Sequence, residues 1–260
     1  MTWQAPPAVV ADLGVGPLRR RAGGVIEVHL GPGLPVAAPG QFVMLDTGDG
    51  ILPHPFTIFR SQDDGGFSLL LRPGGRPVEA LIGRAGGARV RATGPLGRPF
   101  PPPVGSGRVV AAAESGRIAP LYGLVRLLAE EGRTAALVVG GERPEHFAAL
   151  AAFRALGARV ERRHGPGRPA FEHVLDHVQA SDTLYLAGPE AALAAADRRL
   201  TAAGGVAPAA HLALEVAMAC GVGACYGCPL RQRRPKDPRH PYIRACVEGP
   251  VVAAGEVVFA

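Results

Sequence analysis

The chain has 260 residues, of which 47% are hydrophobic and 19% are charged, and its formal net charge is +6. This composition suits a folded globular protein with one large core or a few smaller ones, and it excludes a disordered chain. The arginines are scattered apart from two short runs, and few aromatic residues lie among them, so nucleic-acid binding is weakly supported. No run of about 18 to 20 apolar residues occurs, which argues against a membrane span.

The N-terminus, MTWQAPPAVVADL, lacks the basic and apolar regions of a signal peptide, so we expect a cytoplasmic protein. Thiols stay reduced in the cytoplasm. The four cysteines all lie near the C-terminal end of the chain. They therefore indicate metal binding rather than disulfide bonds.

Residues 1–103 are predicted to form a small antiparallel β-barrel. Short β-rich runs broken by Gly and Pro follow one another from residue 9 to about residue 100, and no stretch with helical periodicity interrupts them. The runs are VVADL, GVIEVHL, QFVMLDT, FTIFR, FSLLLR and ARVRATGPLG.

Residues 104–207 are predicted to form an α/β domain. The PFPPPVGSG linker separates it from the β-rich region before it. Strands are expected at RVVAAA, TAALVVGG and DTLYLAGP, and helices at APLYGLVRLLAEEG, PEHFAALAAFRALG and PEAALAAADRRLTAAGG. Strands and helices that alternate in this way favour a parallel sheet with helices on both faces.

Residues 208–260 are predicted to form a third, small unit, which contains all four cysteines. A short strand, HLALEVAM, runs into the cysteine segment, and GPVVAAGEVVFA closes the chain. This unit is too small for a hydrophobic core of its own, so we expect bound metal to hold it.

The cysteines are Cys220, Cys225, Cys228 and Cys246, which read C-x4-C-x2-C followed by a distant fourth cysteine. This spacing is typical of plant-type ferredoxin ligands for a [2Fe–2S] cluster. Three glycines within the run, at 221, 223 and 227, would let the backbone wrap tightly and direct N–H groups at the sulfurs. Structural zinc and unligated thiols stay open as alternatives, although zinc sites usually take two ligands from each loop.

Several motifs carry a resemblance to a known family. The segment LEVAMACGVGACYGCPL, together with ACVEGPVV, carries most of it, and PGQFVML, HPFTI and GPLG in the barrel carry the rest. Over nearly its whole length, the chain resembles the electron-transfer subunits of type B, two-subunit dihydroorotate dehydrogenases, within the ferredoxin reductase superfamily.

The resemblance implies a series of cofactors. NADH, or another donor, would reduce FAD in the barrel, and a [2Fe–2S] cluster would pass electrons to FMN in a separate catalytic subunit that interconverts orotate and dihydroorotate. A flavin suits the middle position because it accepts two electrons and releases them singly. The chain is therefore expected to be the electron-transfer component of a hetero-oligomeric oxidoreductase in pyrimidine biosynthesis. We expect it to dock through its C-terminal segment, and no catalytic residue is assigned.

The resemblance also implies a set of flavin-binding residues in the barrel. The family's arginine-proline-aromatic-hydroxyl motif corresponds to HPFT, where Thr57 keeps the hydroxyl and His54 replaces an arginine that would pair with pyrophosphate. A second family stretch keeps an arginine and a glycine here, but its closing Gly-Thr pair has changed. The predicted flavin-contacting residues are His54, Pro55, Phe56, Thr57, Leu70, Leu71, Arg72, Gly75, Pro77 and Val78.

The nucleotide loop of the family corresponds to residues 113–121, AESGRIAPL, in which most of the expected glycines are replaced. Glu114 is a carboxylate where an anionic ligand would lie, and Arg117 occupies a glycine position. Both argue against ordinary NAD(H) docking unless the two side chains pair with each other. A later stretch, LYLAGPE, resembles the nicotinamide motif, with Ala187 replacing a cysteine and Leu193 near the methionine position.

Two other functions stay open on the sequence. One is a paralogous redox subunit of another oxidoreductase that has lost NAD binding, and the other is a zinc-stapled, non-redox binding protein. His173 and His177 are expected to form a surface pair rather than a metal site. The basic stretch RQRRPKDPRH is expected to form a loop near the cluster. This loop either attracts a negatively charged partner or is solvated surface without a binding role.

Overall fold

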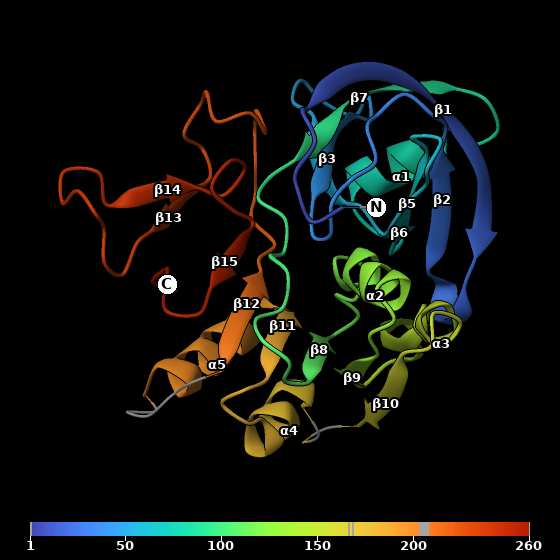
Figure 1. The fold of residues 1–260 in the computed structure, drawn as a ribbon. Coiled ribbons are helices and arrows are strands. Elements are labelled where there is room, and N and C mark those ends of the chain that lie inside the picture. The colour runs from blue at the N-terminus through green and yellow to red at the C-terminus, as the bar shows by residue number, and fades with distance from the viewer. Residues whose placement is uncertain (1, 166, 168, 203–207, 260) are drawn as a thin grey trace.

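The computed structural model describes residues 2–165, 167, 169–202 and 208–259. A curled β-sheet lies above an α/β sheet, and the C-terminal segment runs along one side of both (Figure 1). None of the helices in the described part of the chain has the length and apolar character needed to cross a bilayer.

The N-terminal region forms a seven-stranded antiparallel sheet in the order β4-β3-β7-β1-β2-β6-β5. The sheet curls around a core of buried Val, Leu, Ile and Phe side chains that alternate with outward-facing polar residues. The predicted antiparallel barrel is confirmed. Its strands are β1 (Val9–Arg20), β2 (Ile26–Leu30), β3 (Phe42–Asp46), β4 (His54–Thr57), β5 (Arg60–Ser61), β6 (Phe67–Leu71) and β7 (Arg89–Leu96).

The prediction that no helix interrupts these strands is wrong. Helix α1 (Arg76–Ile82) lies between β6 and β7, with a proline in its first turn and Leu81 fully buried in the barrel core. Its seven residues are too few to show a helical period in the sequence. The expected run FTIFR is also divided, because β4 ends at Thr57 and β5 begins at Arg60.

The second region is a six-stranded sheet in the order β10-β9-β8-β11-β12-β15. The pairs from β10 to β12 are parallel, and β15 is antiparallel to β12. Helices pack on both faces, as predicted: α2 and α3 in the cluster that also contains barrel residue Phe59, and α4 and α5 in the cluster on the other face. The elements are β8 (Val109–Glu114), α2 (Leu121–Glu130), β9 (Ala135–Gly141), α3 (Leu150–Arg154), β10 (Arg159–His164), α4 (Ala170–His177), β11 (Thr183–Ala187) and α5 (Glu190–Ala202).

The expected helix over residues 144–157 is broken. A 3-10 turn (Pro144–Phe147) precedes α3, and Ala149 between them has φ −105° and ψ 1°. The His146 side chain bends back to accept the N–H of Glu142, at 3.2 Å. The edge strand β10 was not predicted because its polar, largely exposed residues carry no apolar pattern. The last residues of the expected helix PEAALAAADRRLTAAGG, 203–205, lie outside the described residues.

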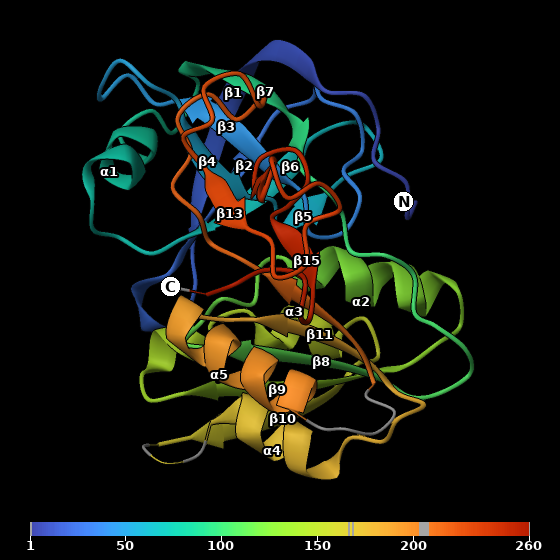
Figure 2. The ribbon, with the colours of Figure 1, turned by 90° about the vertical axis from the view of Figure 1, so that its left-hand side faces the viewer.

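The C-terminal segment contains β12 (Ala209–Ala213), β13 (Pro229–Arg231), β14 (Tyr242–Arg244) and β15 (Val251–Ala253). The expected strand HLALEVAM ends early, at Ala213. Strands β12 and β15 extend the six-stranded sheet, and other parts of the segment pack on β3 and β7, so it bridges both regions (Figure 2). Packing therefore holds this segment in addition to any metal. The domain boundaries after residues 103 and 207 stay a prediction, and the second falls at 203–207, outside the described residues.

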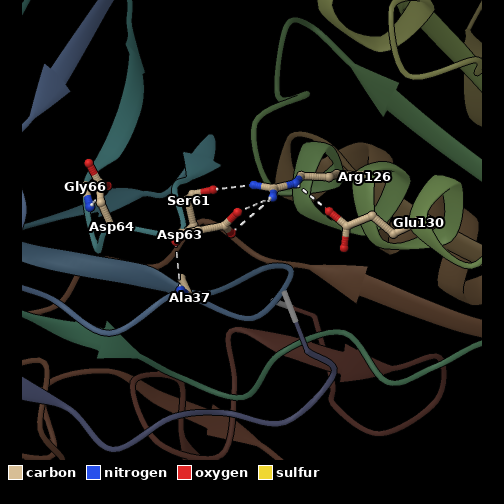
Figure 3. Close-up of polar contacts among 7 residues, drawn as sticks. All are labelled: Ala37, Ser61, Asp63, Asp64, Gly66, Arg126 and Glu130. Atoms are coloured by element: carbon tan, nitrogen blue, oxygen red, sulfur yellow. Dashed lines mark hydrogen bonds and ion pairs between the residues drawn. The ribbon is translucent and has the colours of Figure 1, made fainter.

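Polar contacts fix the barrel against the α/β region. On α2, the Arg126 guanidinium donates to the Ser61 carbonyl at 2.7 Å and to the Asp63 carboxylate at 3.2 Å, and its Nε donates to Glu130 at 2.7 Å (Figure 3). The Ser61 hydroxyl in turn accepts the Ala37 N–H at 2.9 Å. These contacts hold the two regions in one relative orientation, which determines the cavity between them.

Candidate functional site

The four cysteines converge where the C-terminal segment packs on the barrel. Cys228 and Cys246 are buried against Phe42 and Met44 of β3, whereas Cys220 is half-buried and Cys225 is exposed. None of the four forms a disulfide bond. One side of the group therefore faces the protein and the other faces solvent.

The thiols contact one another in two pairs. Cys220 lies beside Cys225, and Cys246 lies beside Cys228. An electrostatic interaction between Cys246 and Cys220 links the pairs. Burial together with the contact with Cys228 raises the pKa of the Cys246 thiol to about 12.

Backbone N–H groups point at the sulfurs. Burial alone would raise the pKa of the Cys220 thiol, but the N–H groups of Cys225, Val222 and Ala224 lower it to about 6. The N–H of Gly227 donates to the Cys225 sulfur at 3.4 Å. Donors of this kind stabilise thiolates, which are the form that binds metal.

The glycines in this loop are required for space and for backbone conformation. Gly221 has φ +70°, and a Cβ placed there would lie 2.3 Å from Met44 Cγ. Gly223 has φ +82°, and its N–H points at the Cys246 sulfur. Both backbone conformations are ones that residues with a side chain rarely adopt.

This donor set fits a binuclear iron–sulfur cluster. The thiols lie in two pairs, which suits two irons that each take two thiolates. One tetrahedral zinc ion would take all four sulfurs.

A cavity of about 650 Å³ lies between the barrel, the α/β region and the C-terminal segment. Nine of the ten predicted flavin-contacting residues line it, and Gly75 is the exception. Gly75 instead caps the N-terminus of α1 with φ +95°, a conformation that favours glycine. The volume falls within the range of about 300–1,000 Å³ typical of small-molecule sites. The lining residues from the predicted set are His54, Pro55, Phe56, Thr57, Leu70, Leu71, Arg72, Pro77 and Val78.

The polar groups of this cavity have other contacts. The His54 Nε2 atom lies 3.1 Å from the Asp49 carboxylate but makes no hydrogen bond within the described part of the chain. Arg72 donates to the Ser115 carbonyl at 2.7 Å, and Arg117, which also lines the cavity, donates to Glu215 at 2.8 Å. The apolar walls and the Thr57 hydroxyl therefore fit a flavin ring, whereas the cations available for its phosphates are few.

A second cavity, of about 900 Å³, lies at the carboxyl ends of β8 and β9. This edge of a parallel sheet is where such folds bind ligands. The cavity shares Arg72 and Arg117 with the flavin-type cavity, and four glutamates line it. Those glutamates are Glu114, Glu142, Glu145 and Glu172.

Glu114 and Arg117 do not pair with each other. The buried Glu114 carboxylate accepts the N–H of Phe171, at the start of α4, at 3.0 Å, and burial raises its pKa. The Arg117 guanidinium reaches the C-terminal segment and donates to Glu215 at 2.8 Å. The nucleotide loop therefore presents a buried carboxylate where a pyrophosphate would need donors.

Comparison with known proteins places these sites in a family. A family model described as the iron-sulfur cluster binding domain of dihydroorotate dehydrogenase B matches residues 215–258. A Bacillus cereus (strain Q1) protein named "Dihydroorotate dehydrogenase B (NAD(+)), electron transfer subunit" is 33% identical over 232 residues, covering 85% of this chain and 86% of that protein. The chain belongs to the dihydroorotate dehydrogenase B electron transfer subunits.

Solved structures share the fold of this electron transfer subunit family. An NADH-dependent reduced ferredoxin-NADP oxidoreductase matches with a TM-score of 0.76 at 21% identity, over 95% of this chain and 89% of that one. Phthalate dioxygenase reductase matches with a TM-score of 0.65 at 17% identity, over 96% and 97%. These likenesses confirm the ferredoxin reductase-like architecture.

Other residues singled out in the sequence lie away from the two cavities. Ala187 and Leu193 are buried in the cores of the α/β region and line neither cavity. His173 and His177 stack on α4 with ring centres 4.6 Å apart, and His173 faces Glu161 at 3.3 Å. The basic loop joins β13 to β14, and Arg233 within it pairs with Asp197 of α5 at 2.6 Å.

Two parts of the electron transfer subunit's site were not predicted. Residues 214–218 line the flavin-type cavity, although the sequence pattern predicted that they continue a strand. Arg244 contacts both cysteine segments, and no local motif marks it. The family match over residues 215–258 is the signal that would have included both.

Proposed function

We propose that this chain is the electron-transfer subunit of a cytoplasmic dihydroorotate dehydrogenase complex in pyrimidine biosynthesis. It would hold FAD in the flavin-type cavity and a [2Fe–2S] cluster on Cys220, Cys225, Cys228 and Cys246. When bound, the flavin supplies the exchange between two-electron and one-electron transfer, and the cluster supplies a one-electron carrier. Membership of the family supports this proposal.

The observation that carries the proposal is the short path between the two sites. Residues 214–218 form one wall of the flavin-type cavity, and Cys220 follows two residues later. Strand β3 makes a second connection, because Phe42 lines the cavity and Met44 packs against Gly221 of the cysteine loop. Carriers that exchange electrons must lie close together, and both connections supply this proximity.

The chain's own residues supply binding and exclusion of water. Phe56, Leu70 and Leu71 form apolar walls suited to an isoalloxazine ring. Thr57 offers a hydroxyl that can donate or accept a hydrogen bond at the ring edge. Arg72 holds the nucleotide loop against the barrel through its bond to Ser115.

The surface around Cys225 suits a protein partner. Val222, Tyr226, Tyr242 and Val247, from the two segments that carry the cysteines, are 42–61% exposed. Apolar centres with a charged rim are common in protein interfaces, and the basic loop of residues 231–240 would favour an acidic rim on the partner. We propose that an FMN-containing catalytic subunit docks here and forms a hetero-oligomer.

A second candidate concerns the electron donor. Four glutamates and three arginines line the second cavity, and one of the glutamates, Glu114, is buried at the sheet edge. A dinucleotide would bring two phosphates close to this buried carboxylate. This observation favours a redox subunit that takes electrons from a donor other than NADH.

The function is tested by purifying the chain together with its natural partner under anaerobic conditions. We expect flavin and iron in the complex, and after chemical reduction we expect orotate to reoxidise both chromophores. The chain without its partner should stay reduced when orotate is added. Orotate-dependent reoxidation of the isolated chain, or a complex that lacks flavin and iron, would contradict the proposal.

A further inference from the structure

Arg244 lies between the two segments that carry the cysteines. It ends β14, two residues before Cys246, and the Glu248 carboxylate follows two residues after that cysteine. Glu248 accepts both the Arg244 backbone N–H, at 2.7 Å, and the guanidinium Nε, at 3.2 Å. Residues 244–248 therefore form a closed loop around Cys246.

The same guanidinium reaches the other cysteine segment. Its Nη1 donates to the Gly223 carbonyl at 3.2 Å, and its central carbon lies 5.2 Å from the centre of the Tyr226 ring. A Cβ on Gly223 would lie 3.0 Å from this Nη1 and 2.7 Å from Val247 Cγ2. The cysteine loop thus approaches Arg244 closely only because residue 223 has no side chain.

Gly223 connects Arg244 to one cysteine of each pair. The Gly223 carbonyl and the Ala224 N–H belong to the same peptide group, and that N–H faces the Cys220 sulfur. The N–H of Gly223 itself faces the Cys246 sulfur. Hydrogen bonds in a chain polarise one another, so a cationic donor on the carbonyl strengthens the bond made by the N–H of the same peptide.

We propose that Arg244 is a positioning residue that holds Gly223 and its following peptide against Cys246 and Cys220. Hydrogen bonds to the sulfurs stabilise the reduced, more negative state of an iron–sulfur centre. Loss of Arg244 therefore lowers the reduction potential of the cluster and speeds its loss from the protein. This inference rests on the proposed function, because it requires a cluster on these cysteines.

The positive charge of Arg244 could by itself raise the reduction potential of the cluster. The Arg244→Lys variant separates this effect of charge from the positioning of Gly223. Lysine keeps the positive charge but lacks the planar fork that reaches Glu248 and Gly223 together. We expect Arg244→Lys and Arg244→Gln both to lower the midpoint potential in a dye-mediated titration. Loss of the cluster to a chelator should be about tenfold faster or more, the usual effect of removing an outer-shell partner.

Arg239→Gln is the matched control. Arg239 is an exposed arginine near the same segment, and its side chain contacts Asp237 rather than the cysteine loop. This variant removes one positive charge and should leave both the potential and the rate of cluster loss unchanged. Glu248→Gln weakens the support of Arg244 and should shift both readouts in the same direction, by less.

The outcomes separate this inference from the proposed function. A wild-type potential and rate of cluster loss in Arg244→Lys would overturn the role of Arg244 while the cluster assignment stands. A wild-type chain without iron would contradict the proposed function itself. If Arg244→Gln retains no cluster, the amide exchange rates of Val222, Gly223 and Ala224 in the metal-free protein are decisive. They should rise in Arg244→Lys and not in Arg239→Gln, and unchanged rates would overturn the inference.

Discussion

The nucleotide loop borders the flavin-type cavity and the cysteine segment begins just beyond its wall at residues 214–218, but the two differ in what they retain of the family pattern. In the cysteine segment, the residues of the motif converge, and N–H groups point at the sulfurs. In the nucleotide loop, Glu114 and Arg117 replace glycines, and their side chains bond to the Phe171 N–H and to Glu215. A cluster site depends on its thiolate side chains, so it is kept as long as the cysteines are kept. A pyrophosphate site depends on backbone N–H groups that the ligand can approach, so side chains added in place of glycines obstruct it.

The largest effect should follow from breaking the cysteine segment. Cys225→Ser removes one of four thiolates, and we expect nearly complete loss of iron and of visible absorbance because the remaining three cannot hold both irons. The measurement is iron content with the visible spectrum. Tyr226→Phe, at the neighbouring exposed position, should keep both, and an unchanged spectrum in Cys225→Ser would refute the ligand assignment.

Gly221 of the cysteine loop is needed both for its backbone conformation and for the space that a side chain would fill, and these two requirements can be tested separately. Gly221→Ala combines φ +70° with a Cβ 2.3 Å from Met44 Cγ, whereas Gly132→Ala has φ +71° and no atom within 4 Å. Left-handed strain should cost about 1–2 kcal/mol in each variant, and overpacking about 1–3 kcal/mol more in Gly221→Ala alone. Urea unfolding measures both values. Equal losses of stability would show that Met44 does not restrict the loop.

The nucleotide loop is tested by titration with NADH. We expect a wild-type Kd weaker than about 100 μM, or about −5.5 kcal/mol, and about tenfold tighter binding in Glu114→Gln, which keeps an acceptor for the Phe171 N–H but removes the charge. Glu142→Gln removes an exposed carboxylate from the same cavity and should change the Kd less. A micromolar Kd in the wild type would contradict this account of the loop.

The smallest effect concerns pH. Burial raises the pKa of Glu114 above its ordinary value of 4.5, so the folded chain binds this proton more tightly than the unfolded chain. This contribution to the free energy of unfolding therefore falls as pH rises from about 4.5 through the raised pKa. Urea unfolding of the metal-free protein should show the fall in the wild type and not in Glu114→Gln. The same pH dependence in both would exclude Glu114 as its source.

Local patterns explain why much of this molecule could be predicted from its sequence. The cysteine spacing, the β-rich runs and the alternation of strands with helices each depend on residues close together in the chain. Helix α1 was missed because its seven residues are too few to show a period, and β10 because it is a polar edge strand.

The contacts of the candidate site depend on residues far apart in the chain. Glu114 binds a residue 57 positions away, and the partner of Arg117 is 98 positions away. The sequence indicated that these two side chains alter the loop, but their partners depend on how the sheet and the C-terminal segment pack. Residues 214–218 were expected in a strand because their mostly apolar pattern suits a strand and a cavity wall equally well. Only the packing of distant parts of the chain places them in the cavity wall.

The most direct test of the central assignment is the metal content of the anaerobically purified chain, measured together with acid-labile sulfide and the visible spectrum. We expect iron and sulfide in equal amounts, about two of each per chain, in a red-brown protein that bleaches with dithionite. A colourless protein with about one zinc per chain and no sulfide would contradict it.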